Sequence, residues 1–175
     1  MSARLDMTDG LQWRAMRGED MPAVSAIAAA VHTDFFEGNA VFAERLTLYP
    51  AGCFVLERAG EIAGYGISHP WTKYRIPALN TLLGRLPDDA DIYYLHDIAL
   101  MPEARSGGFA SRVIEMMAKQ AERDGFNSMA LVAVNGSPGY WQKQGFAIAD
   151  VPELTAKLLS YSEDARYMVR VISAL

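Results

Sequence analysis

The chain has 175 residues, 51% of them hydrophobic, which is enough for one compact domain with a substantial core. Lys and Arg total 16 against 21 Asp and Glu, a formal net charge of -5 that argues against binding nucleic acid or anionic membrane. We therefore expect a small-molecule partner, no nucleic acid and no membrane.

The single cysteine and the N-terminal sequence bear on the compartment. Cys53 lies in an apolar run, so an intramolecular disulfide is excluded and an oxidising compartment is not implied. Residues 1–10 lack the apolar core of a signal peptide, and no stretch approaches the ~18 apolar residues that span a bilayer. We expect a cytoplasmic protein with a flexible segment over 1–10 and a single domain over 11–175.

The first half of the chain alternates strand and helix signals. Pro22 follows an acidic turn and fits a helix start, whereas Pro50 disfavours helix in the residue before it. The predicted elements are a strand over 11–16, helices over 22–31 and 40–48, and a hairpin of strands 53–58 and 62–68.

A stretch rich in Pro, Gly, Asn and Asp, residues 69–91, then reads as a long connection, and loops of that length are usually functional. The elements predicted after it are a strand over 92–100, a helix over 109–124, a strand over 127–134, a short helix over 138–144, and strands over 146–149 and 166–172.

The order of strand, glycine turn, helix and strand over 92–134 predicts a right-handed βαβ unit. A ligand should bind where the carboxyl end of the first strand meets the helix. The helix residues at i, i+4 and i+8 spacing that should face the sheet are Phe109, Val113, Ile114, Met117 and Ala121.

The turn before this helix carries a recognisable pattern. Residues 105–110, Arg-Ser-Gly-Gly-Phe-Ala, fit Arg/Gln-x-x-Gly-x-Gly/Ala. Glycines let a ligand approach the backbone closely, and the exposed N–H groups and dipole of the following helix favour an anion such as a pyrophosphate.

This segment resembles motif A of the GNAT superfamily, and residues 135–146 resemble its motif B. The resemblance implies an α/β (α+β) fold with a mixed, centrally splayed sheet of about six to seven strands and about four helices. It also implies N-acetyl transfer with acetyl-CoA as cosubstrate and no metal.

The resemblance further implies which residues hold the cofactor. Backbone groups of Ile98 and Leu100 would bind the pantetheine arm, amides of 106–111 the pyrophosphate, and Asn135 and Trp141 would line the arm. The full predicted set is Ile98, Ala99, Leu100, Arg105, Ser106, Gly107, Gly108, Phe109, Ala110, Ser111, Asn135 and Trp141.

A narrower likeness is to the arylalkylamine N-acetyltransferases, through residues 95–100 and the hairpin end 64–71. It implies that His96 removes a proton from the amine, which is largely ammonium at neutral pH, and histidine titrates in the useful range. Strand alternation predicts Tyr94, His96, Ile98 and Leu100 on one face. The alternative for His96 is a structural histidine, the role we assign to His32 and His69.

The sequence departs from the family at the general acid. The position of the usual tyrosine holds Trp141, and Tyr140 is adjacent. A shift of one residue rotates a helical side chain by ~100°, so Tyr140 needs a different helix register to act as the acid. We nevertheless assign Tyr140 this role.

The residues expected at the acceptor are Phe35, Phe36, Trp71 and Asp97, with Asp34 and Glu37 as further acidic groups that can attract an amine.

These observations favour direct acetyl transfer from acetyl-CoA to a primary amine of a small molecule in a ternary complex. Acetylation of a protein or peptide, and a non-catalytic acyl-CoA-binding module, stay open as alternatives. The sequence also leaves open a homodimer, the acyl chain preferred, and whether the 69–91 connection covers the site.

Overall fold

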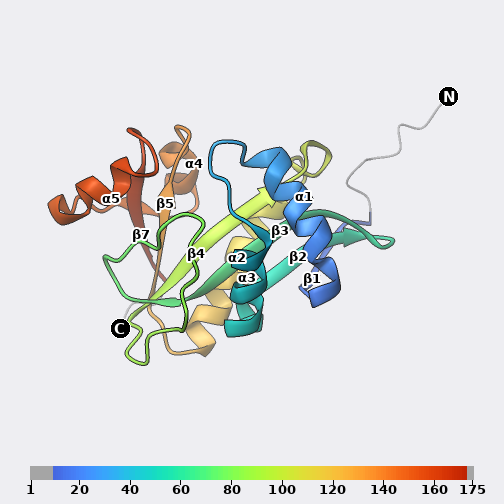
Figure 1. Cartoon of the computed structure of the whole chain (residues 1–175), viewed down its shortest axis with the longest axis horizontal. Helices are drawn as coiled ribbons and strands as arrows, with labels where there is room; N and C mark the ends of the chain where they lie inside the picture. The colour runs from blue at the N-terminus through green and yellow to red at the C-terminus, as the bar shows by residue number, and fades with distance from the viewer. Residues whose placement is uncertain (1–9, 173–175) are drawn as a thin grey trace.

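The computed structural model describes residues 10–172, so the expectation for the N-terminal segment lies outside the described residues, except for Gly10. Over this range the strands form one seven-stranded sheet in the order β1-β2-β3-β4-β5-β7-β6 (Figure 1). Their bounds are β1 Gln12–Ala15, β2 Cys53–Arg58, β3 Glu61–Trp71, β4 Ile92–Leu100, β5 Ser128–Ala133, β6 Ala147–Ile148 and β7 Arg166–Val171.

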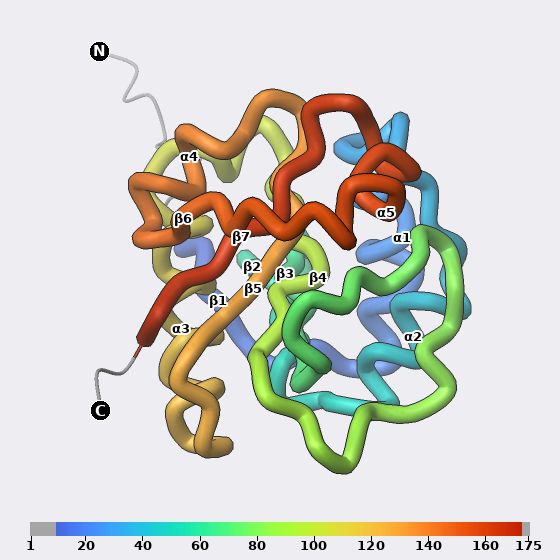
Figure 2. Tube along the Cα trace, turned by 90° about the vertical axis from the view of Figure 1, so that its left-hand side faces the viewer, coloured from blue at the N-terminus to red at the C-terminus, as the bar shows by residue number. Residues whose placement is uncertain are grey.

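Five α-helices accompany the sheet within the described residues: α1 Met21–Val31, α2 Asn39–Leu48, α3 Phe109–Arg123, α4 Pro138–Lys143 and α5 Thr155–Leu159. Helix α3 covers one face, and α1 and α2 cover the other, with the sheet seen between them in Figure 2. The predicted α/β fold is thereby confirmed, with one helix more than the sequence indicated. Helix α5 has only five residues, too few for apolar periodicity to show.

The sheet is mixed, as predicted. Strands β1 to β4 pair antiparallel, β4 pairs parallel to β5, and β7 pairs antiparallel to both β5 and β6. The connection from β4 through α3 to a neighbouring parallel strand is the βαβ unit that the glycine turn indicated.

The core on the α3 side confirms the helical apolar face. All five residues predicted to face the sheet are at most 5% exposed. They pack against alternate residues of the central strands, among them Tyr93 and Leu95 of β4 and Met129 and Leu131 of β5. Burial of each of the four larger side chains, those other than Ala121, contributes about 1.5–3 kcal/mol, and together they fix the start of α3 against the end of β4.

Strand β4 carries a β-bulge at His96. Leu95 pairs with Ser68 and Asp97 pairs with the preceding residue of β3, Ile67, so His96 is the extra residue. After the bulge, Ile98 packs toward α3, whereas Ala99 packs in the core under α1 and α2. The prediction that His96 and Ile98 share a face is therefore wrong, because period-two alternation breaks at the bulge.

Beyond the bulge the sheet opens between β4 and β5. The two strands pair only at Tyr93 with Met129 and Tyr94 with Ala130, although both continue further. This confirms the central splay.

The long connection begins later than predicted, at residue 72, because β3 continues through Trp71. Much of it is held by side chains from helix α2 and its approach. Amides of Leu83 and Gly84 donate to the Glu44 carboxylate over 2.6 and 2.9 Å, and Asn80 bonds to residues 37 and 38. Figure 2 shows this segment lying beside α2.

The longest helix of the described residues, α3, has 15 residues. Across 10–172, none of the helices has both the length and the apolar character needed to cross a membrane.

Candidate active site

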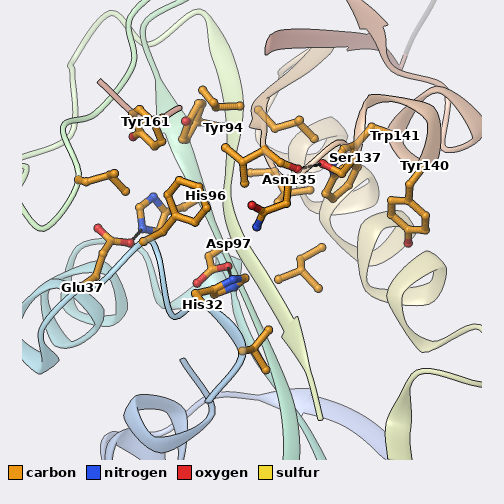
Figure 3. A pocket seen from close by; sticks show the side chains of 18 residues that line it. His32, Glu37, Tyr94, His96, Asp97, Asn135, Ser137, Tyr140, Trp141 and Tyr161 are labelled. Carbon is orange, nitrogen blue, oxygen red and sulfur yellow. Dashed lines mark hydrogen bonds and ion pairs between the residues drawn. The ribbon is translucent and has the colours of Figure 1, made fainter. Parts of the chain in front are cut away.

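Two adjoining cavities lie at the opening between β4 and β5. The first has a volume of about 330 Å³ and the second about 280 Å³. Both are bordered by the same four residues, Val31, Ile98, Tyr140 and Trp141. The two cavities therefore share a wall where the sheet opens, and the chemistry of their other lining residues differs. Figure 3 shows the first cavity.

The second cavity leads toward the glycine turn. Its remaining lining residues are Ala99, Leu100, Arg105 and Ala110, which belong to the end of β4 and the start of α3. These are the elements between which the βαβ unit was predicted to bind its ligand. Arg105 donates from Nε to the carbonyl of Leu100 over 3.1 Å and so fixes the turn to the strand end.

The free edge of β4 in this cavity follows from the strand register. The amide of Met101 donates to Ala63 over 2.8 Å, which makes Leu100 and Gly64 a pair whose own N–H and C=O groups point away from one another. By alternation, Ile98 has the same orientation. Its backbone groups and the Leu100 N–H face the opening, whereas the backbone groups of Ala99 face β3 and pair with Tyr65. This edge suits an amide-bearing arm that binds like a strand.

The Ala99 backbone thus belongs to the β3–β4 ladder, and its side chain is 2% exposed beneath α1 and α2.

The turn before α3 provides an open backbone cradle. Gly107 and Gly108 have φ of 119° and 75°, in the left-handed region where side chains are disfavoured. A Cβ on Gly108 would meet no atom within 4 Å, so the space above the turn is empty. The first amides of α3 have no intrahelical acceptors, and with the helix dipole they favour an anion there. The residues fit the pyrophosphate of a CoA molecule.

Two of the predicted cofactor residues have other partners through their carbonyl or side chain, which does not test the role predicted for their amides. Phe109 is 5% exposed, and its carbonyl accepts a hydrogen bond from Trp13 Nε1 over 2.9 Å. The hydroxyl of Ser111 accepts one from Gln144 Nε2 over 3.0 Å. Ser106 and both glycines are exposed at the turn itself, and Asn135 lines the first cavity.

The first cavity contains His96 in contact with an acidic residue that precedes α2. His96 Nε2 lies 2.7 Å from Glu37 Oε1, with the two side chains 5% and 7% exposed. Burial acts to raise the pKa of Glu37, but the neighbouring His96 and the Asn80 amide outweigh it and the pKa is lowered. The carboxylate is therefore ionised, and a carboxylate accepts, so Nε2 of His96 carries a proton.

A second acid–imidazole pair lies beside the first. His32 Nε2 is 2.6 Å from Asp97 Oδ1, and the Tyr65 hydroxyl donates to Asp97 Oδ2. The His32 contact is an ion pair without good hydrogen-bond alignment. Burial lowers the pKa of His32, but the Asp97 contact and the charges of Asp97 and Glu37 raise it overall. His32 thus lines the cavity, and the purely structural role assigned to it from sequence misses this pairing.

His69 has the structural setting that the sequence indicated. It is 1% exposed, and Nδ1 lies 2.8 Å from the carbonyl of Pro70. Burial lowers its pKa to about 3, so the ring stays neutral. A carbonyl only accepts, which places the proton of the ring on Nδ1.

Tyr140 and Trp141 both belong to the wall that the two cavities share. Their rings contact edge to face at 5.2 Å between centroids, and Trp141 packs in turn on Phe146. Tyr140 is 41% exposed, and partial burial raises the pKa of its hydroxyl. One turn of α4 thus presents both rings to the opening between β4 and β5, on the side opposite His96 (Figure 3).

The predicted acceptor residues divide into two groups. Phe35 and Asp97 line the first cavity. Phe36 is 69% exposed, and Trp71 packs with Ile76 and Tyr94 in the core beside β5 and β7, so neither is a lining residue. Sequence reasoning missed Leu79, Tyr94 and Tyr161 as lining residues; for Tyr94 the signal was its place two residues before His96.

Residues 13–146 match the model of the Acetyltransferase (GNAT) family. The chain therefore belongs to this family. No curated protein matches the sequence at a significant level.

Solved structures with the same fold differ in what they do. Ard1 from Thermoplasma volcanium aligns with a TM-score of 0.72 at 15% identity, over 94% of this chain and 99% of that one. The ribosomal-protein-S18-alanine N-acetyltransferase from Escherichia coli gives 0.66 at 19%, over 94% and 96%. The GphF GNAT-like decarboxylase in complex with isobutyryl-CoA gives 0.75 at 17%, over 93% and 100%. At these identities the likeness shows the fold alone.

Proposed function

We propose that the protein transfers an acetyl group from acetyl-CoA to the primary amine of a small molecule by direct attack in a ternary complex. The observation that carries this proposal is the pair of adjoining cavities at the splay of β4 and β5. One cavity borders Arg105 and Ala110, on either side of the glycine turn, and the other borders His96. A cofactor arm in one cavity and an acceptor in the other meet at the shared wall.

The charge of the first cavity favours an amine over an acid as the acceptor. Two carboxylates, Glu37 and Asp97, and two imidazoles, His32 and His96, line it. Among its lining residues there is no Lys or Arg that would pair with a substrate carboxylate. The remaining surface is mainly apolar and aromatic, contributed by Phe35, Leu79, Tyr94, Leu131, Val132 and Tyr161. A compact amine with an apolar body fits this environment.

The residues present divide the proton transfers between them. His96 takes the proton from the ammonium nitrogen, which frees the lone pair that attacks the thioester carbon. A C–N bond forms, the C–S bond breaks, and Tyr140 donates the proton to the departing thiolate. Cys53 is buried, which raises the pKa of its thiol to about 12, so it is unsuited to carry the acyl group covalently.

The decisive experiment is release of free thiol from acetyl-CoA across amines, polyamines, amino acids and peptides. We expect turnover with apolar primary amines and a much lower kcat/KM for the amino acid that adds a carboxylate to the same amine. Because one of the similar structures acetylates a protein alanine, peptides with free N-termini belong in the panel. Turnover of peptides alone would replace the small-molecule proposal with the peptide one. Tight CoA binding without turnover of any acceptor would favour a binding module.

A further inference from the structure

The Glu37 contact leaves one nitrogen of His96 available to the cavity. Nε2 faces the Glu37 carboxylate at 2.7 Å. No group among residues 10–172 forms a hydrogen bond with Nδ1. Nδ1 is also absent from the fully buried side-chain atoms that lack a partner, so it is not fully buried. Since His96 lines the first cavity, Nδ1 is the ring nitrogen that remains accessible from it.

Glu37 is itself fixed from a second direction. The Asn80 amide donates to Glu37 Oε2 over 3.1 Å, while the Asn80 side-chain oxygen accepts from the Gly38 amide over 2.8 Å. Asn80 has φ of 52°, a left-handed conformation that asparagine tolerates better than most residues. The residue pair 37–38 is thus clamped by the 72–91 segment, and each Glu37 oxygen has a different partner.

We infer that Glu37 is a positioning residue for His96: it holds the ring proton on Nε2 and leaves Nδ1 as the bare nitrogen that accepts the proton of the acceptor amine. The inference rests on the proposed function for the role of Nδ1. The position of the proton in the free enzyme does not depend on it. The 72–91 segment takes part through Asn80, which orients the carboxylate.

The molecule contains an internal contrast for testing this assignment. Its sequence has three histidines, His32, His69 and His96. His69 donates from Nδ1 to the Pro70 carbonyl, so it should show the opposite tautomer to His96. The opposite tautomers expected for these two rings provide, in one spectrum, a reference that depends on neither activity nor a ligand.

The test is the ¹⁵N–¹H correlation spectrum of the imidazoles at about pH 8.5, well above the ordinary histidine pKa. The His96 signals are identified by their loss in His96→Gln. We expect the proton of His96 on Nε2 in the wild-type protein, and loss of that preference in Glu37→Leu, which has no acceptor. A proton on Nδ1 in the wild type, or an unchanged tautomer in Glu37→Leu, would overturn the inference.

Kinetics with an acceptor amine provide the second measurement. We expect kcat to fall at least about tenfold in Glu37→Leu with a smaller change in KM, since general base catalysis contributes about 10²–10⁴-fold. Glu37→Gln keeps the size and one acceptor oxygen, so it should retain more activity than Glu37→Leu. Asp88→Asn removes an exposed carboxylate of the 72–91 segment and should leave kcat unchanged.

The two proposals fail in different ways. If no acceptor is turned over but the tautomer depends on Glu37, acetyl transfer is wrong and the positioning of His96 stands. If amines are acetylated and Glu37→Leu keeps full kcat with its wild-type tautomer, the positioning role is wrong and the proposed function stands. A folded state for each variant is checked by the His69 signal, because that ring is buried in the core beside β4.

Discussion

His32 and Asp97, which are 65 positions apart in the sequence, form an ion pair of 2.6 Å on the wall of the first cavity. His32 directly follows α1, and Asp97 directly follows the bulge of β4. The pair therefore joins the helical layer to the central strand at the point where the sheet opens.

This pair should make stability depend on pH in a defined direction. The pKa of His32 is raised in the folded state, against burial, by Asp97 and Glu37. The stability that the His32–Asp97 pair contributes is therefore fully present below the unfolded histidine pKa of about 6.5. It is lost as the pH rises through the pKa of His32 in the folded protein. In urea unfolding, His32→Gln should lower the free energy of unfolding more at about pH 5.5 than at about pH 9. An equal loss at both pH values would contradict the assignment.

The glycine turn can be tested with a matched pair of substitutions. At φ of 75°, Gly108→Ala should cost about 1–2 kcal/mol of stability without a clash, because the space around a Cβ there is empty. Gly108→Glu should cost a similar amount and, in addition, place a carboxylate where the turn favours an anion. We expect calorimetry with CoA to show at least a tenfold greater loss of affinity for Gly108→Glu, about 1.4 kcal/mol. Equal CoA affinities for the two variants would show that the turn is not part of the cofactor site.

The role of His96 as the base predicts a particular pH dependence. In His96→Ala, turnover should fall by about 10²-fold or more near pH 7, where an alkylamine is almost entirely ammonium. Activity should recover partly toward about pH 10, since free amine then becomes abundant without help from the enzyme. The measurement is the pH profile of kcat/KM for one amine. A profile parallel to that of the wild type would return His96 to a structural role.

Substitutions at Tyr140 and at Trp141 should have different effects, the first on the chemical step and the second on CoA binding or stability. Tyr140→Phe keeps the ring that packs on Trp141 but removes the hydroxyl, so kcat should fall with little change in CoA affinity. The loss can be less than the ~10²-fold of general acid catalysis, because a thiolate is a good leaving group. Trp141→Phe removes bulk between Tyr140 and Phe146 and should weaken CoA binding or stability more than kcat. Full kcat in Tyr140→Phe would show that another group or water is the acid.

The parts of the fold that the sequence predicted are those set by local chemistry. The turn at Gly107 and Gly108 needs left-handed backbone that glycine adopts freely, and the apolar spacing of α3 follows from helix geometry. The end of helix α2 follows from Pro50 in the same way. Each of these features is readable within a window of a few residues.

The parts that it missed depend on residues far apart in the chain. His96 and Glu37 are separated by 59 positions, and the acidic partner of His32 also lies on another element. Nothing in the sequence near His32 signals that partner. The position of the bulge at His96 escaped prediction because strand alternation assumes a regular ladder, and the irregularity lies in how β4 pairs with β3.

The bulge at His96 also has a consequence for the exchange of segments between related enzymes. It separates the part of β4 that pairs with β5 from the part that diverges from it, and it is where the imidazole enters the cavity. A recombination point inside 92–100 would divide the opening of the sheet from the residue that works within it. Chimeric enzymes should therefore inherit β4 as one block together with β3, residues 61–71. The bulge at His96 exists only in the pairing of these two strands.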